Sequence, residues 1–154
     1  MLQFRKELFV GFVVAMMAGL PVPGASGKEN AYETVKAADH FAIGGVGVAG
    51  AITPQELAMR EVRDGPQAET LLRKLLREAT PPGQMYALFA LRQLGPADYE
   101  ALSAPYRQSS TAIPTISGCI IHTQPMSAAV LWIDQYAREI STWEKRRATP
   151  KATR

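Results

Sequence analysis

The chain has 154 residues, of which 47% are hydrophobic and 20% are charged. These proportions exclude a disordered tail, a collagen-like fibre and a multi-domain enzyme, and they fit a single domain. One cysteine and two histidines are present, so an intramolecular disulfide and a four-cysteine zinc site are excluded.

The N-terminal segment has the features of a secretory signal. Arg5 and Lys6 precede 13 uncharged residues, 8–20. A membrane-spanning helix needs about 20 apolar residues, whereas a signal needs a basic start, about 7 to 15 apolar residues and small residues before the cut. Ala25, Ser26 and Gly27 supply the small residues. We therefore predict a signal peptide over 1–27 and export to the periplasm or exterior of a bacterial cell. An uncleaved anchor is the alternative.

The positive charge of the chain is concentrated at its C-terminal end. Residues 28–143 carry ten basic and twelve acidic side chains, whereas residues 144–154 carry five basic and one acidic. We predict a single mainly helical domain over 28–143 and a basic, disordered tail over 144–154. This distribution argues against a nucleic-acid-binding face, and it allows a weak contact of the tail with an anionic membrane surface.

Helix signals follow one another through the first part of this domain. Thr53 and Glu56 form a capping box around Pro54, so a helix begins there, and Leu57, Ala58 and Val62 are expected on its inner face until Gly65 ends it in a left-handed conformation. A second helix is expected from Pro66, with an apolar face at helical spacing: Ala68, Leu71, Leu72, Leu75, Leu76 and Ala79.

Two further helices are expected after a Pro81-Pro82-Gly83 punctuation. Residues 85–91 contain no polar residue, so the third helix should be covered on most sides. After Gly95-Pro96, a fourth helix carries Tyr99, Leu102 and Tyr106, and Pro105 and the Ser109-Ser110 loop are expected to end it. Connections this short predict antiparallel helical hairpins.

The last third of the domain changes character. Residues 113–123 are rich in β-branched side chains and predict a short strand, whose expected partner is the segment 41–48. A long terminal helix is predicted over 126–147. The fold class expected is therefore mainly α, with short antiparallel helical hairpins, a long C-terminal helix and a minor two-stranded β element.

One part of the chain resembles a known family. Residues 84–96, Gln-Met-Tyr-Ala-Leu-Phe-Ala-Leu-Arg-Gln-Leu-Gly-Pro, followed by Glu100-Ala101-Leu102, resemble the second half of one HEAT-type helical repeat running into the next. The resemblance covers residues 54–107. It implies a binding or scaffolding role without catalysis.

Few residues suggest chemistry. Residues 45–50 spell G-x-G-x-x-G, but the next helix starts late and no second parallel strand follows, so a glycine-rich turn is favoured over a nucleotide site. Cys119 and His122 point to opposite faces of the predicted strand, with His40 elsewhere, so we expect Cys119 to be a small buried residue and predict no metal and no cofactor. Trp132 and Tyr136 are expected in the core, whereas Trp143 could contact a partner.

The sequence thus favours an exported helical domain that acts through protein-protein contacts and is not an enzyme, with no catalytic residue assigned. The alternative left open is a small enzyme or ligand-binding domain that uses the Gly44–Gly50 loop and Cys119.

Overall fold

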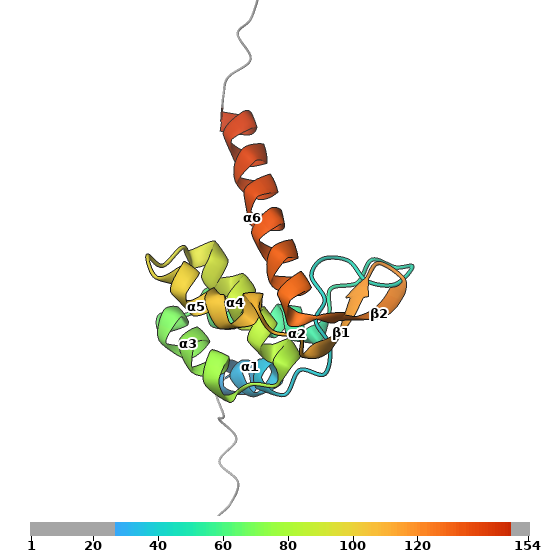
Figure 1. Ribbon diagram of the computed structural model, residues 1–154, viewed down its shortest axis with the longest axis horizontal. Coiled ribbons are helices and arrows are strands. Elements are labelled where there is room, and N and C mark those ends of the chain that lie inside the picture. The colour runs from blue at the N-terminus through green and yellow to red at the C-terminus, as the bar shows by residue number, and fades with distance from the viewer. Residues whose placement is uncertain (1–26, 149–154) are drawn as a thin grey trace, which may run out of the picture.

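The computed structural model describes residues 27–148, with side chains from Asn30 to Glu139. It is mainly helical, with a two-stranded antiparallel sheet and a long C-terminal helix, which confirms the expected fold class (Figure 1). The elements within these residues are α1 (Gly27–Lys36), α2 (Pro54–Arg63), α3 (Ala68–Glu78), α4 (Pro81–Leu94), α5 (Tyr99–Arg107), β1 (Ala112–Ser117), β2 (Ile120–Pro125) and α6 (Met126–Ala148).

Helix α4 forms the centre of the core. Met85, Tyr86, Leu88 and Leu91 are fully buried, and α1, α2, α3 and α6 all pack against this helix. A helix that is apolar on every side is stable only when neighbours cover it, so the expectation for residues 85–91 is confirmed. The other helices each contribute one apolar face to the same core, as Leu72 and Leu75 do from α3.

Helix α1 was not expected from the sequence. Its apolar face is short and consists of Ala31, Tyr32 and Val35, which are buried against α2 and the start of α4. The contact with α4 is close, because a Cβ atom at Gly83 would collide with the Val35 carbonyl oxygen. The predicted signal peptide lies outside the described residues except for Gly27, where α1 begins.

The start of α4 differs from the sequence expectation. Pro81, Pro82 and Gly83 form the first turn of the helix rather than a break before it. Proline is tolerated there because the first helical N–H groups need no partner within the helix. The Thr80 side chain caps this end by accepting a hydrogen bond from the Gly83 N–H at 3.3 Å.

Two other helix boundaries also depart from expectation. Gly65 does not adopt a left-handed conformation, whereas Gly95, with a φ of 68°, does so at the end of α4. Helix α3 begins at Ala68 rather than at Pro66. Helix α5 contains Pro105, carries Tyr106 as expected and ends at Arg107, before the Ser109-Ser110 loop.

The inner face of α2 was placed partly wrong. Leu57 is 54% exposed, whereas Met59 is fully buried and packs with Ala58 and Val62 on the inner face. The inner face therefore runs through positions 58, 59 and 62, a spacing of one, three and four that suits an α-helix equally well.

The β element is a hairpin rather than one strand paired with residues 41–48. Ile116 pairs with Ile121 and Ser117 with Ile120 across a turn at Gly118 and Cys119. Gly118 has a φ of 56°, as the first central position of a type II′ hairpin turn requires. Segment 41–48 makes only isolated bridges, in which Phe41 borders the far edge of β1.

The first turns of helix α6 pack on the body of the domain. Met126, Ala129, Val130 and Ile133 are buried, and the helix then projects away from the body (Figure 1). It ends at Ala148, so the first residues of the predicted disordered tail are helical and residues 149–154 lie outside the described part. Within residues 27–148, no helix combines the length and apolar character needed to cross a membrane.

The packing of α3 generates a stability prediction. Leu72 and Leu75 are fully buried, so Leu72→Ala or Leu75→Ala should lower the free energy of unfolding by about 2 to 5 kcal/mol. Chemical denaturation measures this. Leu57→Ala is the matched control, because its side chain is exposed, and should change stability by less than about 0.5 kcal/mol. Equal small effects at all three positions would contradict the described core.

Candidate functional site

The glycine-rich segment forms a tight turn. Val46 and Ala51 exchange two backbone hydrogen bonds of 2.8 and 3.0 Å, and the Gly50 N–H donates to the Gly47 carbonyl at 3.1 Å. Gly47 and Gly50 have φ values of 69° and 62°, a left-handed conformation that glycine adopts without strain. The turn does not open onto a helix, because α2 begins only at Pro54. The arrangement therefore lacks the helix N-terminus on which a dinucleotide-binding turn places its phosphates.

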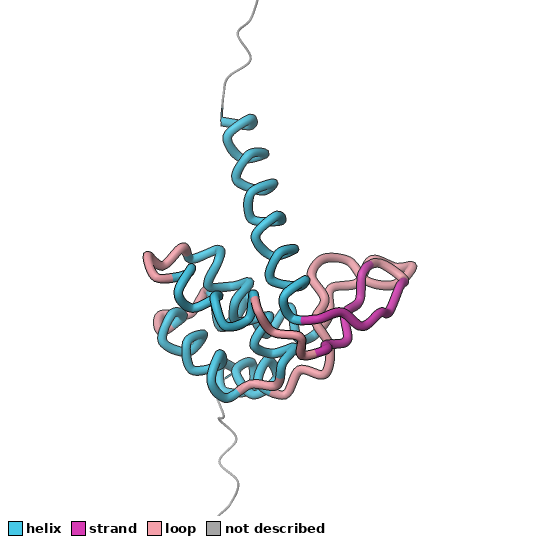
Figure 2. The backbone as a smooth tube through the Cα atoms, viewed as in Figure 1, coloured by secondary structure: helices cyan, strands magenta, loops and turns pink. Residues whose placement is uncertain are grey.

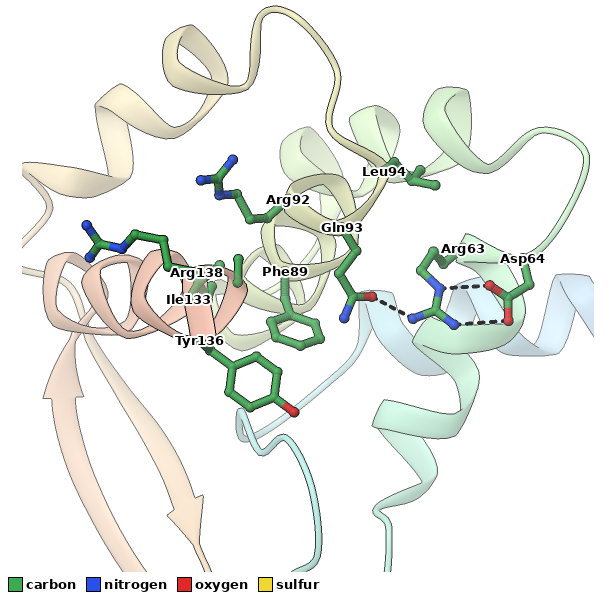
Figure 3. Close-up of a pocket in the computed structure, with 10 residues that line it drawn as sticks. Arg63, Asp64, Phe89, Arg92, Gln93, Leu94, Ile133, Tyr136 and Arg138 are labelled. Carbon is green, nitrogen blue, oxygen red and sulfur yellow. Dashed lines mark hydrogen bonds and ion pairs between the residues drawn. The ribbon is translucent and has the colours of Figure 1, made fainter. Parts of the chain in front are cut away.

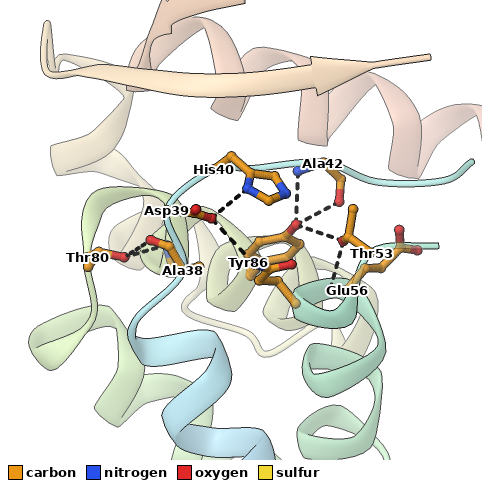
Figure 4. Close-up of polar contacts among 10 residues, drawn as sticks. Ala38, Asp39, His40, Ala42, Thr53, Glu56, Thr80 and Tyr86 are labelled. Carbon is orange, nitrogen blue, oxygen red and sulfur yellow. Dashed lines mark hydrogen bonds and ion pairs between the residues drawn. The ribbon is translucent and has the colours of Figure 1, made fainter. Parts of the chain in front are cut away.

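A buried hydroxyl group holds this segment against the core. The Tyr86 hydroxyl accepts a hydrogen bond from the Ala42 N–H and donates to the Ala42 carbonyl, both at 3.0 Å, and lies 3.3 Å from the Thr53 hydroxyl (Figure 4). Burial raises the pKa of Tyr86, so the neutral phenol persists. One side chain of α4 thus fixes both ends of the segment 42–53.

A buried carboxylate supports the same segment. Glu56 is 1% exposed and accepts a hydrogen bond from the Gly44 N–H at 2.7 Å. Its other oxygen pairs with Arg60, one helical turn later. The expected capping box is half formed: the Thr53 hydroxyl accepts from the Glu56 N–H, but the Glu56 carboxylate turns to the glycine segment. Glu56 is therefore a structural anchor with both oxygens occupied.

The structure brings the glycine turn close to the hairpin turn that contains Cys119. The Gly47 N–H donates to the Gly118 carbonyl at 2.8 Å, and Figure 2 shows the loop running beside the hairpin. Cys119 is exposed, so its expected burial is wrong, because it occupies the hairpin turn. His122 lines a small pocket of about 150 Å³ beside Trp132.

The histidines contribute no shared site. His40 lies in the loop after α1, where its Nδ1 is 2.6 Å from the Asp39 carboxylate. Across residues 27–148, no group of three or more His, Cys, Asp or Glu side chains is placed to hold a metal ion. The described side chains form no hydrogen bond or ion pair with the Cys119 thiol.

A second candidate surface is a groove between three helices, here called the arginine groove. It has a volume of about 550 Å³ and runs between the C-terminal ends of α2 and α4 and the exposed side of α6 (Figure 3). Its floor is apolar and its rim carries three arginines. The lining residues are Arg63, Asp64, Phe89, Arg92, Gln93, Leu94, Ile133, Tyr136, Ala137 and Arg138.

The arginine groove already holds one carboxylate in a forked geometry. The Arg63 Nε lies 2.7 Å from one Asp64 oxygen and its Nη2 lies 3.1 Å from the other, and Gln93 accepts from the same guanidinium. These hydrogen bonds from Arg63 hold the pKa of Asp64 below its usual value. The pair is exposed, so it contributes little stability.

Arg92, the second arginine of the rim, forms an ion pair with a buried carboxylate of the core. The Arg92 Nε lies 3.4 Å from the carboxylate of Asp134, which is 8% exposed, and Arg107 contacts the other oxygen at 2.6 Å. A buried charge is costly without partners, and two cations surround this one. Arg92 therefore links α4 to α6 as well as lining the groove.

An aromatic stack borders the arginine groove. Trp132 and Tyr136 stack with ring centroids 5.1 Å apart and planes 21° apart, and Phe89 lies 5.6 Å from Tyr136. Trp132 is 38% exposed and Tyr136 is half-buried. The predicted core position is therefore correct only in part, because both rings lie at the edge of the core. Trp143 has no described side chain.

Comparisons with known proteins identify no relative. No family model matches the chain, and neither does any curated protein or solved structure. The resemblance of residues 54–107 to HEAT-type repeats thus assigns no family.

Sequence reasoning did not find the arginine groove. Arg63, Arg92 and Arg138 belong to different helices, and tertiary packing alone brings them to one rim. The available signal was the spacing of Trp132 and Tyr136, which places two large rings on one side of α6 beyond its fully apolar stripe.

The anchoring role of Tyr86 can be tested by removing one oxygen atom. Tyr86→Phe leaves the Ala42 N–H and carbonyl buried without this partner, which should lower the free energy of unfolding by about 1 to 3 kcal/mol. Tyr136→Phe is the control, because its hydroxyl makes no hydrogen bond with the described residues, and should change stability by less than about 0.5 kcal/mol. Denaturation curves of both variants decide the point, and an unchanged Tyr86→Phe protein would contradict it.

Proposed function

We propose that this chain is a non-catalytic protein-binding domain whose arginine groove takes an acidic segment of a partner protein. The observation that carries the proposal is the local reversal of charge. Residues 28–143 have more acidic than basic side chains, yet three arginines and one aspartate line the groove around an apolar floor, and one of these arginines, Arg92, also pairs with the buried Asp134. This surface is complementary to a segment that alternates carboxylates with aliphatic or aromatic side chains.

The composition of the groove suits a protein partner. Binding energy at protein interfaces is concentrated in aromatic and arginine side chains that border a pocket. Phe89, Tyr136 and Ile133 offer such an apolar floor, and a volume of about 550 Å³ accommodates a few side chains of a peptide. Arginine can grip a carboxylate with two parallel hydrogen bonds, which gives orientation as well as affinity.

The Asp64 pair supports a binding mode for the incoming carboxylate. Asp64 is exposed and belongs to the same helix end as Arg63, so its pair with Arg63 adds little to stability. A carboxylate of the partner can share or replace Asp64 on this guanidinium at small cost. A carboxylate of the partner can therefore take the place of the Asp64 carboxylate on Arg63.

The alternative function has weaker support. Catalysis by Cys119 needs a base within hydrogen-bond reach of the thiol, and the described side chains provide none. The contact between Gly47 and Gly118 brings the glycine turn to the hairpin, but the cavity beside the hairpin is lined by His122 and not by Cys119. We therefore do not adopt an enzymatic function.

Peptide selection tests the groove directly. The protein is expressed in bacteria and purified in the form that the cells produce. A library of random 12-residue peptides displayed on phage is then selected on this protein. Enriched peptides should combine Asp or Glu with Leu, Ile, Phe or Trp. Arg63→Glu and Arg138→Glu should each weaken the binding of a selected synthetic peptide at least about tenfold, which corresponds to about 1.4 kcal/mol. Fluorescence anisotropy of the labelled peptide measures the affinity.

The control is Arg77→Glu, which reverses the charge of an exposed arginine on α3 outside the groove. It should leave peptide affinity unchanged. Selected peptides without acidic residues, or equal losses in all three variants, would contradict the proposed function.

We further infer that the chain is exported and cleaved after Gly27. The supporting features are Arg5, Lys6 and the 13 uncharged residues that follow. Cleavage there removes a single residue from α1 and leaves its buried face intact. Intact-mass analysis of the periplasmic fraction should find a chain that begins at Lys28. A chain that begins at Met1 and sediments with membranes would establish the anchor instead.

A further inference from the structure

The outer edge of β2 is open for strand pairing. On β1, the Ile116 N–H donates to the Phe41 carbonyl at 3.0 Å, and the Pro114 carbonyl accepts from the Phe41 N–H at 2.9 Å. The main-chain groups of these two residues therefore point away from β2. In an antiparallel pair, two directly opposed residues either both bond to each other's main chain or both point their main-chain groups away from each other. Ile121 and Thr123, which lie opposite Ile116 and Pro114, therefore point their main-chain groups away from β1.

These outward groups have no partner in the described part of the chain. No hydrogen bond joins the main chain of Ile121 or Thr123 to another described residue, and both side chains are exposed. The β2 strand is also apolar at its start, where Ile120 and Ile121 are 67% and 74% exposed. The edge combines unused hydrogen-bonding capacity with exposed apolar surface.

Residues 27–148 do not provide the usual protection of an exposed strand edge at β2. Natural edges are blocked by charged side chains, especially lysine, by proline within the strand or by a covering segment. The hairpin, residues 112–125, contains no Lys, Arg, Asp or Glu, and the proline of β2 is its last residue. The other edge of the same hairpin is covered by Phe41. Only the β2 edge is left available in this small sheet.

We propose that β2 pairs antiparallel with β2 of a second copy of this chain and forms a four-stranded sheet across a two-fold axis. One register uses every outward group. In it Ile121 of each copy lies opposite Thr123 of the other, which makes four backbone hydrogen bonds, and the two His122 residues face each other on the axis. An isologous contact of this kind closes on itself and does not propagate into a fibre.

A second copy is the occupant that the edge fits best. The strand is uncharged, so it offers nothing to a charged partner segment and does not repel itself. A two-stranded hairpin is a marginal unit, whereas a sheet of three or more strands is independently stable. The pairing extends the sheet through a strand that has no buried side chain. This surface is separate from the arginine groove, so the inference does not depend on the proposed function.

The size of the contact predicts a weak, concentration-dependent dimer. Six residues per copy bury less area than a standard interface, and such small interfaces are typical of transient association. Sedimentation equilibrium of the protein purified from expressing cells should show a monomer-dimer equilibrium at protein concentrations from about 10 μM to about 1 mM. A chain that remains monomeric over this range would overturn the proposal.

Two substitutions on the edge test whether β2 makes the contact. His122→Lys places two like charges opposite each other on the axis, and Thr123→Pro removes an outward N–H without touching the ladder to β1. Each should raise the dissociation constant at least about tenfold. Thr123→Ala retains the N–H and should dimerise like the unmodified chain, and circular dichroism checks that every variant folds. Dimerisation that survives both substitutions in folded protein would assign the contact to another surface.

Cross-linking tests the register. The two Cα atoms at position 122 are expected about 4.5 Å apart, as in a pair without mutual hydrogen bonds, which lies within the range of about 4.4 to 6.8 Å that a disulfide spans. The double variant Cys119→Ser, His122→Cys should therefore form a covalent dimer on mild oxidation. The matched variant Cys119→Ser, Ala101→Cys, with an exposed cysteine on α5, should not. Equal cross-linking of both variants would overturn the proposed register.

Discussion

The Tyr86 hydroxyl is the contact on which the irregular half of the molecule depends. It lies in the middle of the core helix, is fully buried, and satisfies both main-chain groups of Ala42. Because it also contacts Thr53, which caps α2, it couples the glycine turn to the helical body. The hairpin depends on this arrangement in turn, since Phe41 borders β1 and Gly47 contacts the hairpin turn. The Tyr86 hydroxyl, together with the Glu56 carboxylate that accepts from Gly44, thus positions the glycine segment and the hairpin.

Helix α6 is attached to the body by one apolar face and one buried charge. Val130 and Ile133 supply the apolar contact, and Asp134 lies between Arg92 and Arg107. Burial first, and the Asp134 charge second, raise the pKa of the neighbouring Tyr99, so its ring remains neutral beside this cluster. Arg107 is also paired with Glu100. The cluster fixes the direction in which α6 leaves the body, and it therefore sets the width of the arginine groove.

Sequence patterns predicted the features that local chemistry controls. The Thr53 cap and the apolar spacing of α3 gave correct helices, because capping and periodicity act within one turn. Helix α1 was missed because its apolar face is too short to stand out. The sequence does not distinguish the turn at Gly118 from a strand, since one glycine among β-branched residues also fits a strand interior. The buried role of Glu56 and the arginine groove depend on contacts between distant segments, which no local pattern encodes.

The residues that stabilise the core differ from those that form the two proposed contacts, peptide binding in the arginine groove and β2 pairing. Substitutions at the contact residues can therefore be interpreted separately from effects on stability. Tyr86 and Leu72 are buried, whereas Arg138 and Thr123 are exposed, so a change at an exposed position can alter binding while the core stays intact. Arg92 is the exception, because it lines the groove and also neutralises Asp134. A loss of binding in an Arg92 variant would combine a missing contact with a displaced α6. Arg63 pairs with Asp64 and Gln93 rather than with Asp134, which makes it the residue through which the groove can be judged most directly.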